Sequence, residues 1–189
     1  MGISKRQAWA VATVAVALVP ATSGAGSAHA VGDLRGPGVT GSSLGAAGGT
    51  CNPAQLTVGG GELDGGLSHT GSIVIFTNRG GPCTLRGYPD MVEIDRNGRI
   101  VERARRTLGG YLGGAHRVRT VHLATGGSAS AVYEGLDAQQ YGEPPCPEYT
   151  ALLVTPPGTT RATRLSRSDA LLGVCDLEIH PVVPGRNGQ

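Results

Sequence analysis

Four cysteines are the side chains with the clearest chemistry in this sequence. They are Cys51, Cys83, Cys146 and Cys175. Their number is even, and neither a Cys-x-x-Cys nor a His-x-x-x-His spacing accompanies them. Two disulfides are therefore a better interpretation than a metal site, although the sequence alone allows three pairings.

One of the three pairings is favoured by strand geometry. Strands are expected at 54–58 and 73–78, and if they form a hairpin, Cys51 falls beside the segment from Gly81 to Cys83. A Cys51–Cys83 bridge would close a loop of about 30 residues, worth roughly 3–4 kcal/mol in the chain-entropy model. Cys146–Cys175 then follows by elimination.

A second feature is the concentration of basic residues between Arg96 and Arg119. This stretch holds seven arginines and one acid, Glu102. Guanidinium groups bind carboxylates and phosphates in a fork geometry, so the stretch predicts an anion-facing surface patch. The alternative is a solvated hairpin whose charge is balanced by an acidic loop at 134–148. The candidate surface-binding residues are Arg103, Arg105, Arg106, Tyr111, Arg117 and Arg119.

Tyr111 is a candidate because of its position between two glycine pairs, Gly109-Gly110 and Gly113-Gly114. A tyrosine at the tip of such a loop is either a recognition residue or an anchor that packs onto the sheet.

Catalytic and metal-binding patterns are weak. His116 and His122 would lie about 20 Å apart on a continuous strand, too far to share one metal ion. Ser128 and Ser130 follow two glycines as in a nucleophile elbow, but the closing glycine is missing and a strand follows where a helix should. We therefore expect no catalytic residue, no metal and no cofactor.

The N-terminus has the features of a secretory signal peptide over residues 1–30. Lys5 and Arg6 precede an apolar run, Ala8 to Val19, and Ala28-His29-Ala30 fits a cleavage site. The apolar run is shorter than the roughly 20 residues that span a bilayer, so a short membrane anchor is the weaker alternative. The sequence thus predicts a secreted, extracellular protein.

Cleavage would also remove the net charge. Without Lys5 and Arg6 the chain would hold fourteen arginines and fourteen acidic residues. A neutral chain has no global attraction to nucleic acid or, after cleavage, to an anionic membrane.

The remaining chain predicts one domain. Residues 31–50 form a Gly/Ser/Ala-rich tether, 51–183 a folded domain and 184–189 a disordered tail. Short apolar or alternating segments separated by Gly/Pro turns predict an all-β, antiparallel immunoglobulin-like β-sandwich of about 7–9 short strands with two disulfides. The expected strands are 54–58, 73–78, 91–95, 99–103, 117–123, 128–133, 149–155, 161–165 and 177–183.

The order of these signatures resembles the actinobacterial secreted domain-of-unknown-function family 4232. Its most specific part is Pro-Cys-Thr-Leu-Arg-Gly-Tyr-Pro at 82–89, preceded by Gln-Leu-Thr-Val at 55–58 and Thr-Asn-Arg-Gly at 77–80. A His-Leu-Ala-Thr-Gly-Gly-Ser-Ala segment at 122–129 follows, with Thr125 where the family usually has proline. The resemblance implies a secreted β-sandwich with disulfides, and it supplies no catalytic residue or ligand.

These observations favour an exported, non-enzymatic binding domain that contacts an unknown protein or an anionic cell-wall polymer. The alternative is a secreted hydrolase or enzyme inhibitor whose site has no recognisable motif.

Overall fold

The computed structural model describes residues 48–136, 146, 148–166 and 174–189. The expected signal peptide and the expected tether up to residue 47 lie outside the described residues. Within them, the regular structure is one 3-10 turn, η1 (Pro53–Gln55), and twelve β-strands. Residues 48–50, expected to end the tether, lie against the strand that contains Thr84, because Thr84 N–H donates to Gly49 O at 3.0 Å.

The larger sheet has six strands. Its order is β1-β2-β8-β11-β6, and β12 pairs with β8 outside this path. Neighbours are antiparallel except β11 and β6, which are parallel. The strands are β1 (Leu56–Gly66), β2 (His69–Asn78), β6 (Arg105–Arg106), β8 (Ser128–Leu136), β11 (Cys175–Ile179) and β12 (Val183–Pro184).

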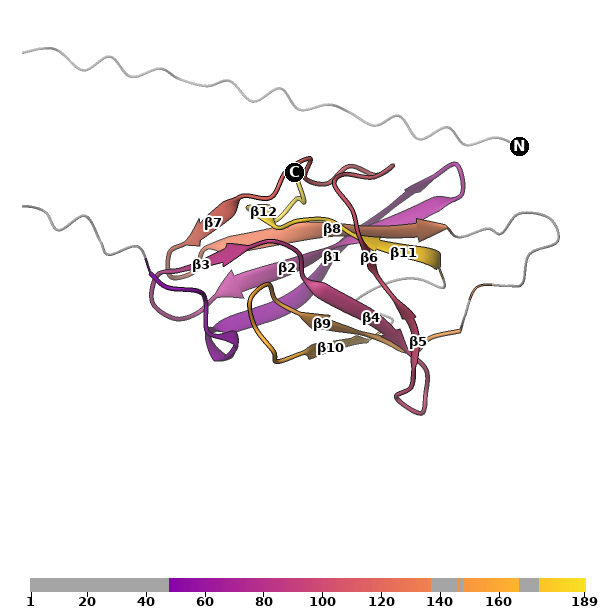
Figure 1. Ribbon diagram of the computed structural model, residues 1–189, viewed down its shortest axis with the longest axis horizontal. Coiled ribbons are helices and arrows are strands. Elements are labelled where there is room, and N and C mark those ends of the chain that lie inside the picture. The colour runs from indigo at the N-terminus through magenta and orange to yellow at the C-terminus, as the bar shows by residue number, and fades with distance from the viewer. Residues whose placement is uncertain (1–47, 137–145, 147, 167–173) are drawn as a thin grey trace, which may run out of the picture. The chain divides into compact units, whose positions relative to one another are not determined.

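A four-stranded antiparallel sheet and a two-stranded ribbon complete the fold (Figure 1). The order of the four-stranded sheet is β10-β9-β4-β5, and the ribbon pairs β3 with β7. The fold is therefore all-β and sandwich-like, as expected, although the strands are more numerous than predicted. These strands are β3 (Cys83–Arg86), β4 (Asp90–Ile94), β5 (Ile100–Arg103), β7 (Thr120–Leu123), β9 (Ala151–Thr155) and β10 (Thr163–Ser166).

The main core lies between the sheets. Phe76 and Tyr133 come from β2 and β8, and Met91 and Leu152 come from β4 and β9; all four are fully buried in one apolar cluster. Because strand side chains alternate between faces, each of these strands contributes every second residue to this core.

Several predicted boundaries differ from the structure, two of them at glycines or prolines. The expected strand 117–123, for example, is a strand only from Thr120 to Leu123, so Arg117 and Arg119 precede β7. The expected loop at 59–70 is instead a continuation of the β1–β2 hairpin, which pairs as far as Gly66 and His69. Glycines still supply ladder hydrogen bonds, and Leu67 and Ser68 form the turn with φ of 48° and 66°. The expected strand 177–183 is interrupted after Ile179, since Pro181 lacks an N–H to donate.

The segment 184–189, expected to be a disordered tail, also differs. Pro184 pairs with Ala129 in β12, and Gly188 N–H donates to the buried Ser130 hydroxyl at 3.0 Å. A buried hydroxyl needs a partner, and the backbone of the C-terminal segment provides one.

Both disulfides form in the favoured pairing, Cys51–Cys83 and Cys146–Cys175. The β1–β2 register explains the first bridge. Leu56 pairs with Asn78. Cys51 lies five residues before Leu56, and Cys83 lies five residues after Asn78, so the two cysteines are brought together.

The hydrogen bonds of Asn78 explain the Thr-Asn-Arg-Gly motif at 77–80. Its side chain is fully buried, and its amide nitrogen donates to Gly81 O at 2.9 Å and to Ala124 O at 3.1 Å. Its amide oxygen accepts from Gly80 N–H and from the Gln55 side chain, both at 2.9 Å. This asparagine thus joins the end of β2 to the turn at 80–81, to Ala124 after β7 and to Gln55 of η1, using both the donors and the acceptor of its amide.

An ionisable group lies inside the core. Glu93 on β4 is fully buried, pairs across the sheet with Glu102, and neither of its carboxyl oxygens has a hydrogen-bond partner among the described residues. Burial, together with the charge of Glu102, raises the pKa of Glu93 to about 8. Glu93 is therefore protonated at neutral pH.

This burial predicts a pH-dependent stability. The ordinary pKa of the glutamate is 4.5, so the folded state binds a proton that the unfolded chain releases between that value and about 8. The free energy of unfolding should fall as the pH rises from about 5 to about 8.

Glu93→Gln should flatten this slope and be more stable than the wild type by about 2–4 kcal/mol at the alkaline end, as urea unfolding would measure. Glu62→Gln, at an exposed position, should keep the wild-type slope; a pH-independent wild type would contradict the prediction.

Candidate functional site

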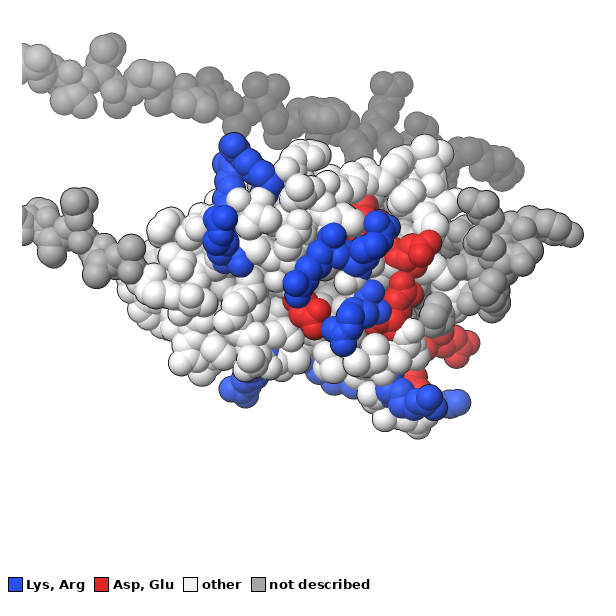
Figure 2. Space-filling model, in the orientation of Figure 1, with Lys and Arg blue, Asp and Glu red and all other residues white. Residues whose placement is uncertain are grey.

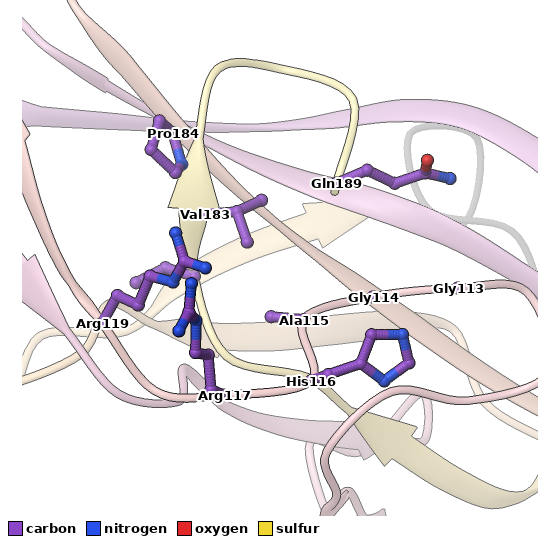
Figure 3. A pocket seen from close by; sticks show the side chains of 10 residues that line it. Gly113, Gly114, Ala115, His116, Arg117, Arg119, Val183, Pro184 and Gln189 are labelled. Atoms are coloured by element: carbon purple, nitrogen blue, oxygen red, sulfur yellow. The ribbon is translucent and has the colours of Figure 1, made fainter.

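A pocket lies between the segment that precedes β7 and strand β12. Its volume is about 590 Å³. The walls combine glycine backbone, an apolar side and basic side chains, and Figure 3 shows the side chains from close by. The lining residues are Gly113, Gly114, Ala115, His116, Arg117, Arg119, Val182, Val183, Pro184 and Gln189.

Arg117 and Arg119 give this pocket its charge. Both side chains are exposed, and both guanidinium groups point toward β12 (Figure 3). Among the described residues, no carboxylate forms a salt bridge with either of them. Two positive groups without a counter-ion on one concave surface favour a bound anion.

The other arginines of the predicted patch have acidic partners. Arg103 lies 2.8 Å and Arg106 3.8 Å from the carboxylate of Asp90, and Arg105 forms a salt bridge with Glu178. Figure 2 shows both situations on one face: basic side chains among acidic ones, and a separate basic group without acidic neighbours. The structure thus divides the patch, and only Arg117 and Arg119 belong to the pocket.

Tyr111 is both exposed and anchored. Half of its surface, 51%, is accessible, and its ring stacks on His69 with centroids 4.4 Å apart. Its backbone N–H donates to Glu134 at 2.7 Å. The tyrosine lies outside the arginine pocket, in a separate pocket with His69.

Glu134 positions the glycine-rich loop 109–116, which forms one wall of the arginine pocket. Its side chain is only 3% exposed, and its two oxygens accept backbone hydrogens from Tyr111 at 2.7 Å and Leu112 at 2.6 Å. The sequence placed Glu134 in an acidic surface loop, but β8 continues through it to Leu136. A buried carboxylate needs such donors, so the loop is held by charge-assisted hydrogen bonds.

Glycines are required in this loop because its backbone lies too close to Glu134 and His180 for a side chain to fit. A Cβ on Gly110 would overlap Glu134 Oε1 and lie 2.7 Å from His180 Nε2. A Cβ on Gly114 would lie 2.5 Å from the His180 ring, and φ there is +89°. On the sheet below, Gly71 pairs with Glu134, and a side chain at Gly71 would meet Leu112.

His180 is a functional candidate that the sequence analysis missed. Its ring is fully buried, with Nε2 3.5 Å from Glu134 Oε1 and Nδ1 3.1 Å from Thr107 Oγ1. Thr107 Oγ1 in turn lies 2.9 Å from Glu178. The spacing Glu178-x-His180 places both side chains on one face of a strand and was visible in the sequence, but Glu134 joins them only through strand pairing.

The serines considered for catalysis have other partners. Ser128 Oγ lies 3.1 Å from Thr77 Oγ1, and Ser130 Oγ accepts from Gly188 N–H. His122 is exposed on β7, opposite Thr84 of β3. Among the described residues, no hydrogen bond joins His122 to either serine.

Fold and site together define a disulfide-bonded, all-β domain with an arginine-lined pocket. The chain belongs to the family described as "Domain of unknown function (DUF4232)", whose model matches residues 51–182. No curated protein and no solved structure matches it. The family description assigns no activity, so function has to be inferred from the site.

Two disulfides are typical of an oxidising extracellular or periplasmic setting. In the described part of the chain, none of the structure has the length and apolarity of a membrane-spanning helix.

The packing of loop 109–116 predicts a local effect of one methyl group. Gly110→Ala should displace the loop from Glu134 and reduce stability by about 1–3 kcal/mol, because the carboxylate would lose its buried donors. Amide hydrogen exchange should increase at Tyr111 and Leu112 while β2 and β8 remain protected. Gly81→Ala, where a Cβ meets nothing within 4 Å, is the control. Unchanged protection of Tyr111 and Leu112 in Gly110→Ala would contradict this assignment.

Proposed function

We propose that this chain is an exported, non-enzymatic binding module that holds an anionic group of its ligand in the pocket of Arg117 and Arg119. The observation that carries the proposal is the pair of guanidinium groups that share one pocket and have no acidic partner among the described residues. The exported location is supported by the signal-like segment 1–30 and by the two disulfides.

The chemistry of the pocket favours a phosphate or carboxylate ligand. Each guanidinium presents a planar fork of N–H donors that matches the oxygens of such groups, and His116 adds donor capacity at the rim. The apolar wall of Val182, Val183 and Pro184 would contact the uncharged part of the ligand. A volume of about 590 Å³ is within the range of pockets that accept small molecules or one unit of a polymer.

An anionic cell-wall polymer is the ligand class that fits best. Such a polymer presents phosphate or carboxylate at regular intervals, so that a pocket for one charged unit suffices to attach the domain to a surface. An acidic segment of a partner protein offers the same group, and a wall preparation stripped of phosphate distinguishes the two.

The test is retention on purified Gram-positive cell wall at about 0.15 M salt. Arg117→Ser/Arg119→Ser should lower retention at least about tenfold, since each charge-assisted contact contributes roughly 1.5–3 kcal/mol. Raising the salt to about 0.5 M should weaken wild-type retention, because exposed charges are screened. Walls from which hydrofluoric acid has removed phosphate polymers should retain little of the wild type.

Arg96→Ser/Arg99→Ser is the matched control, as it removes the same charge from the exposed β4–β5 turn. It should bind as the wild type does. Equal retention of the Arg117→Ser/Arg119→Ser variant and the wild type would refute the pocket, and equal loss in both double variants would show attraction by net charge alone.

A further inference from the structure

Three potential metal ligands lie on one face of the larger sheet, at the junction of β8 and β11. Glu134 and Glu178 are directly opposite each other in this antiparallel pair, and His180 follows two residues after Glu178. One ligand atom from each residue can be chosen so that all three lie within 4.8 Å of one another. Like charges directly opposite in a sheet repel, so this arrangement requires positive charge nearby.

The hydrogen bonds of Thr107 determine which nitrogen of His180 carries a hydrogen. Thr107 Oγ1 has one hydrogen, and it donates this to the carboxylate of Glu178 at 2.9 Å. Toward His180 Nδ1, at 3.1 Å, the same oxygen can then only accept, as can the carbonyl of Thr107 at 3.2 Å. Nδ1 is therefore the protonated nitrogen.

His180 Nε2 then presents a lone pair to a carboxylate. It is fully buried, has no hydrogen-bond partner among the described residues, and lies 3.5 Å from Glu134 Oε1. The Glu134 oxygens already accept hydrogens from Tyr111 and Leu112. Two acceptors that face each other in a buried site need a positive charge between them, which is either a proton or a metal ion.

We propose that Glu134, Glu178 and His180 bind a divalent metal ion of the zinc type. Ligands about 2.1 Å from a tetrahedral ion are separated by roughly 3.4 Å, which matches the 3.5 Å between His180 Nε2 and Glu134 Oε1. One imidazole nitrogen and carboxylate oxygens suit zinc, manganese or cobalt better than calcium or magnesium.

The surroundings of the three ligands are those of a metal site. His180 donates its other ring hydrogen to a backbone carbonyl, Glu134 is oriented by two backbone N–H groups, and Glu178 by Thr107 and Arg105. Such partners orient the ligands of metal sites and increase their affinity. Arg105 neutralises only one of the two carboxylates, so a divalent ion meets net negative charge.

Two of the three ligands line a surface pocket. Glu134 and Glu178 both line a pocket of about 270 Å³, whose rim includes the exposed Asp176 and the stacked pair His69 and Tyr111. This pocket is separate from the one with Arg117 and Arg119, so the metal site does not depend on the proposed function.

The test is zinc binding by tag-free, chelator-treated protein, measured by calorimetry and by elemental analysis after dialysis. We expect one zinc ion per chain and a rise in Tm of about 5–10 °C at zinc concentrations near 100 times Kd. Calcium and magnesium at the same concentration should leave Tm unchanged.

Glu178→Gln is the decisive variant, since its side chain is partly exposed and glutamine preserves its shape. It should lower zinc affinity at least about tenfold while its metal-free Tm shows that it folds. His180→Gln should do the same, and if it does not fold, Glu178→Gln decides alone. His122→Gln and Glu62→Gln, which change exposed residues of the same types, should bind zinc as the wild type does.

Absence of stoichiometric binding of zinc, manganese and cobalt would overturn the proposal, as would unchanged affinity in Glu178→Gln. A nitrogen-15 NMR signal of a hydrogen-bearing Nε2 in the presence of zinc would also overturn it, because the cation would then be a proton. Arg117→Ser/Arg119→Ser should bind zinc normally, so that failure of the arginine pocket and failure of the metal site are distinguishable.

Discussion

The hydrogen bonds of the buried Glu134 carboxylate are the interaction on which the candidate functional face depends. Strand β8 lies between β2 and β11, so a charged residue near its end is taken out of water. Its oxygens obtain donors from the backbone of loop 109–116, a segment with few apolar side chains of its own. The same loop continues into the wall of the arginine pocket. A single charge in a central strand thus connects the sheet, the glycine-rich loop and the candidate binding surface.

Charge pairing in three dimensions decides which basic residues are available. Arg103, Arg105 and Arg106 stand close to Arg117 and Arg119 in the sequence, yet only the first three meet Asp90 or Glu178. A guanidinium beside a carboxylate attracts a further anion less than an unpaired one does, although Asp90 alone faces both Arg103 and Arg106. The proposed binding surface is consequently smaller than the basic stretch of the sequence, and it lies beside β12 instead of on the β4–β5 hairpin.

A buried glutamate occurs on each of the two large sheets, and the two differ in their hydrogen-bond donors. Glu93 on β4 has no donor among the described residues and is protonated at neutral pH, whereas Glu134 on β8 has two backbone donors at short distance. The first is expected to make stability depend on pH, and the second accepts hydrogen bonds from loop 109–116. Desolvation acts on both carboxyl groups, and of the two only Glu134 has backbone donors that compensate for it.

The local features of this protein were readable from its sequence. Alternating apolar residues and Gly/Pro turns predicted the all-β class, the Asn97-Gly98 turn predicted the β4–β5 hairpin, and hairpin symmetry favoured Cys51–Cys83. These depend on neighbours within about 30 residues, where spacing restricts geometry. The site could not be predicted in the same way. Glu134, Glu178 and His180 meet because β8 pairs with β11 across some 40 residues, and burial of Glu134 follows from the position of β8 within the sheet. Strand order and charge pairing are set by the packing of the whole domain, and a single sequence does not contain them explicitly.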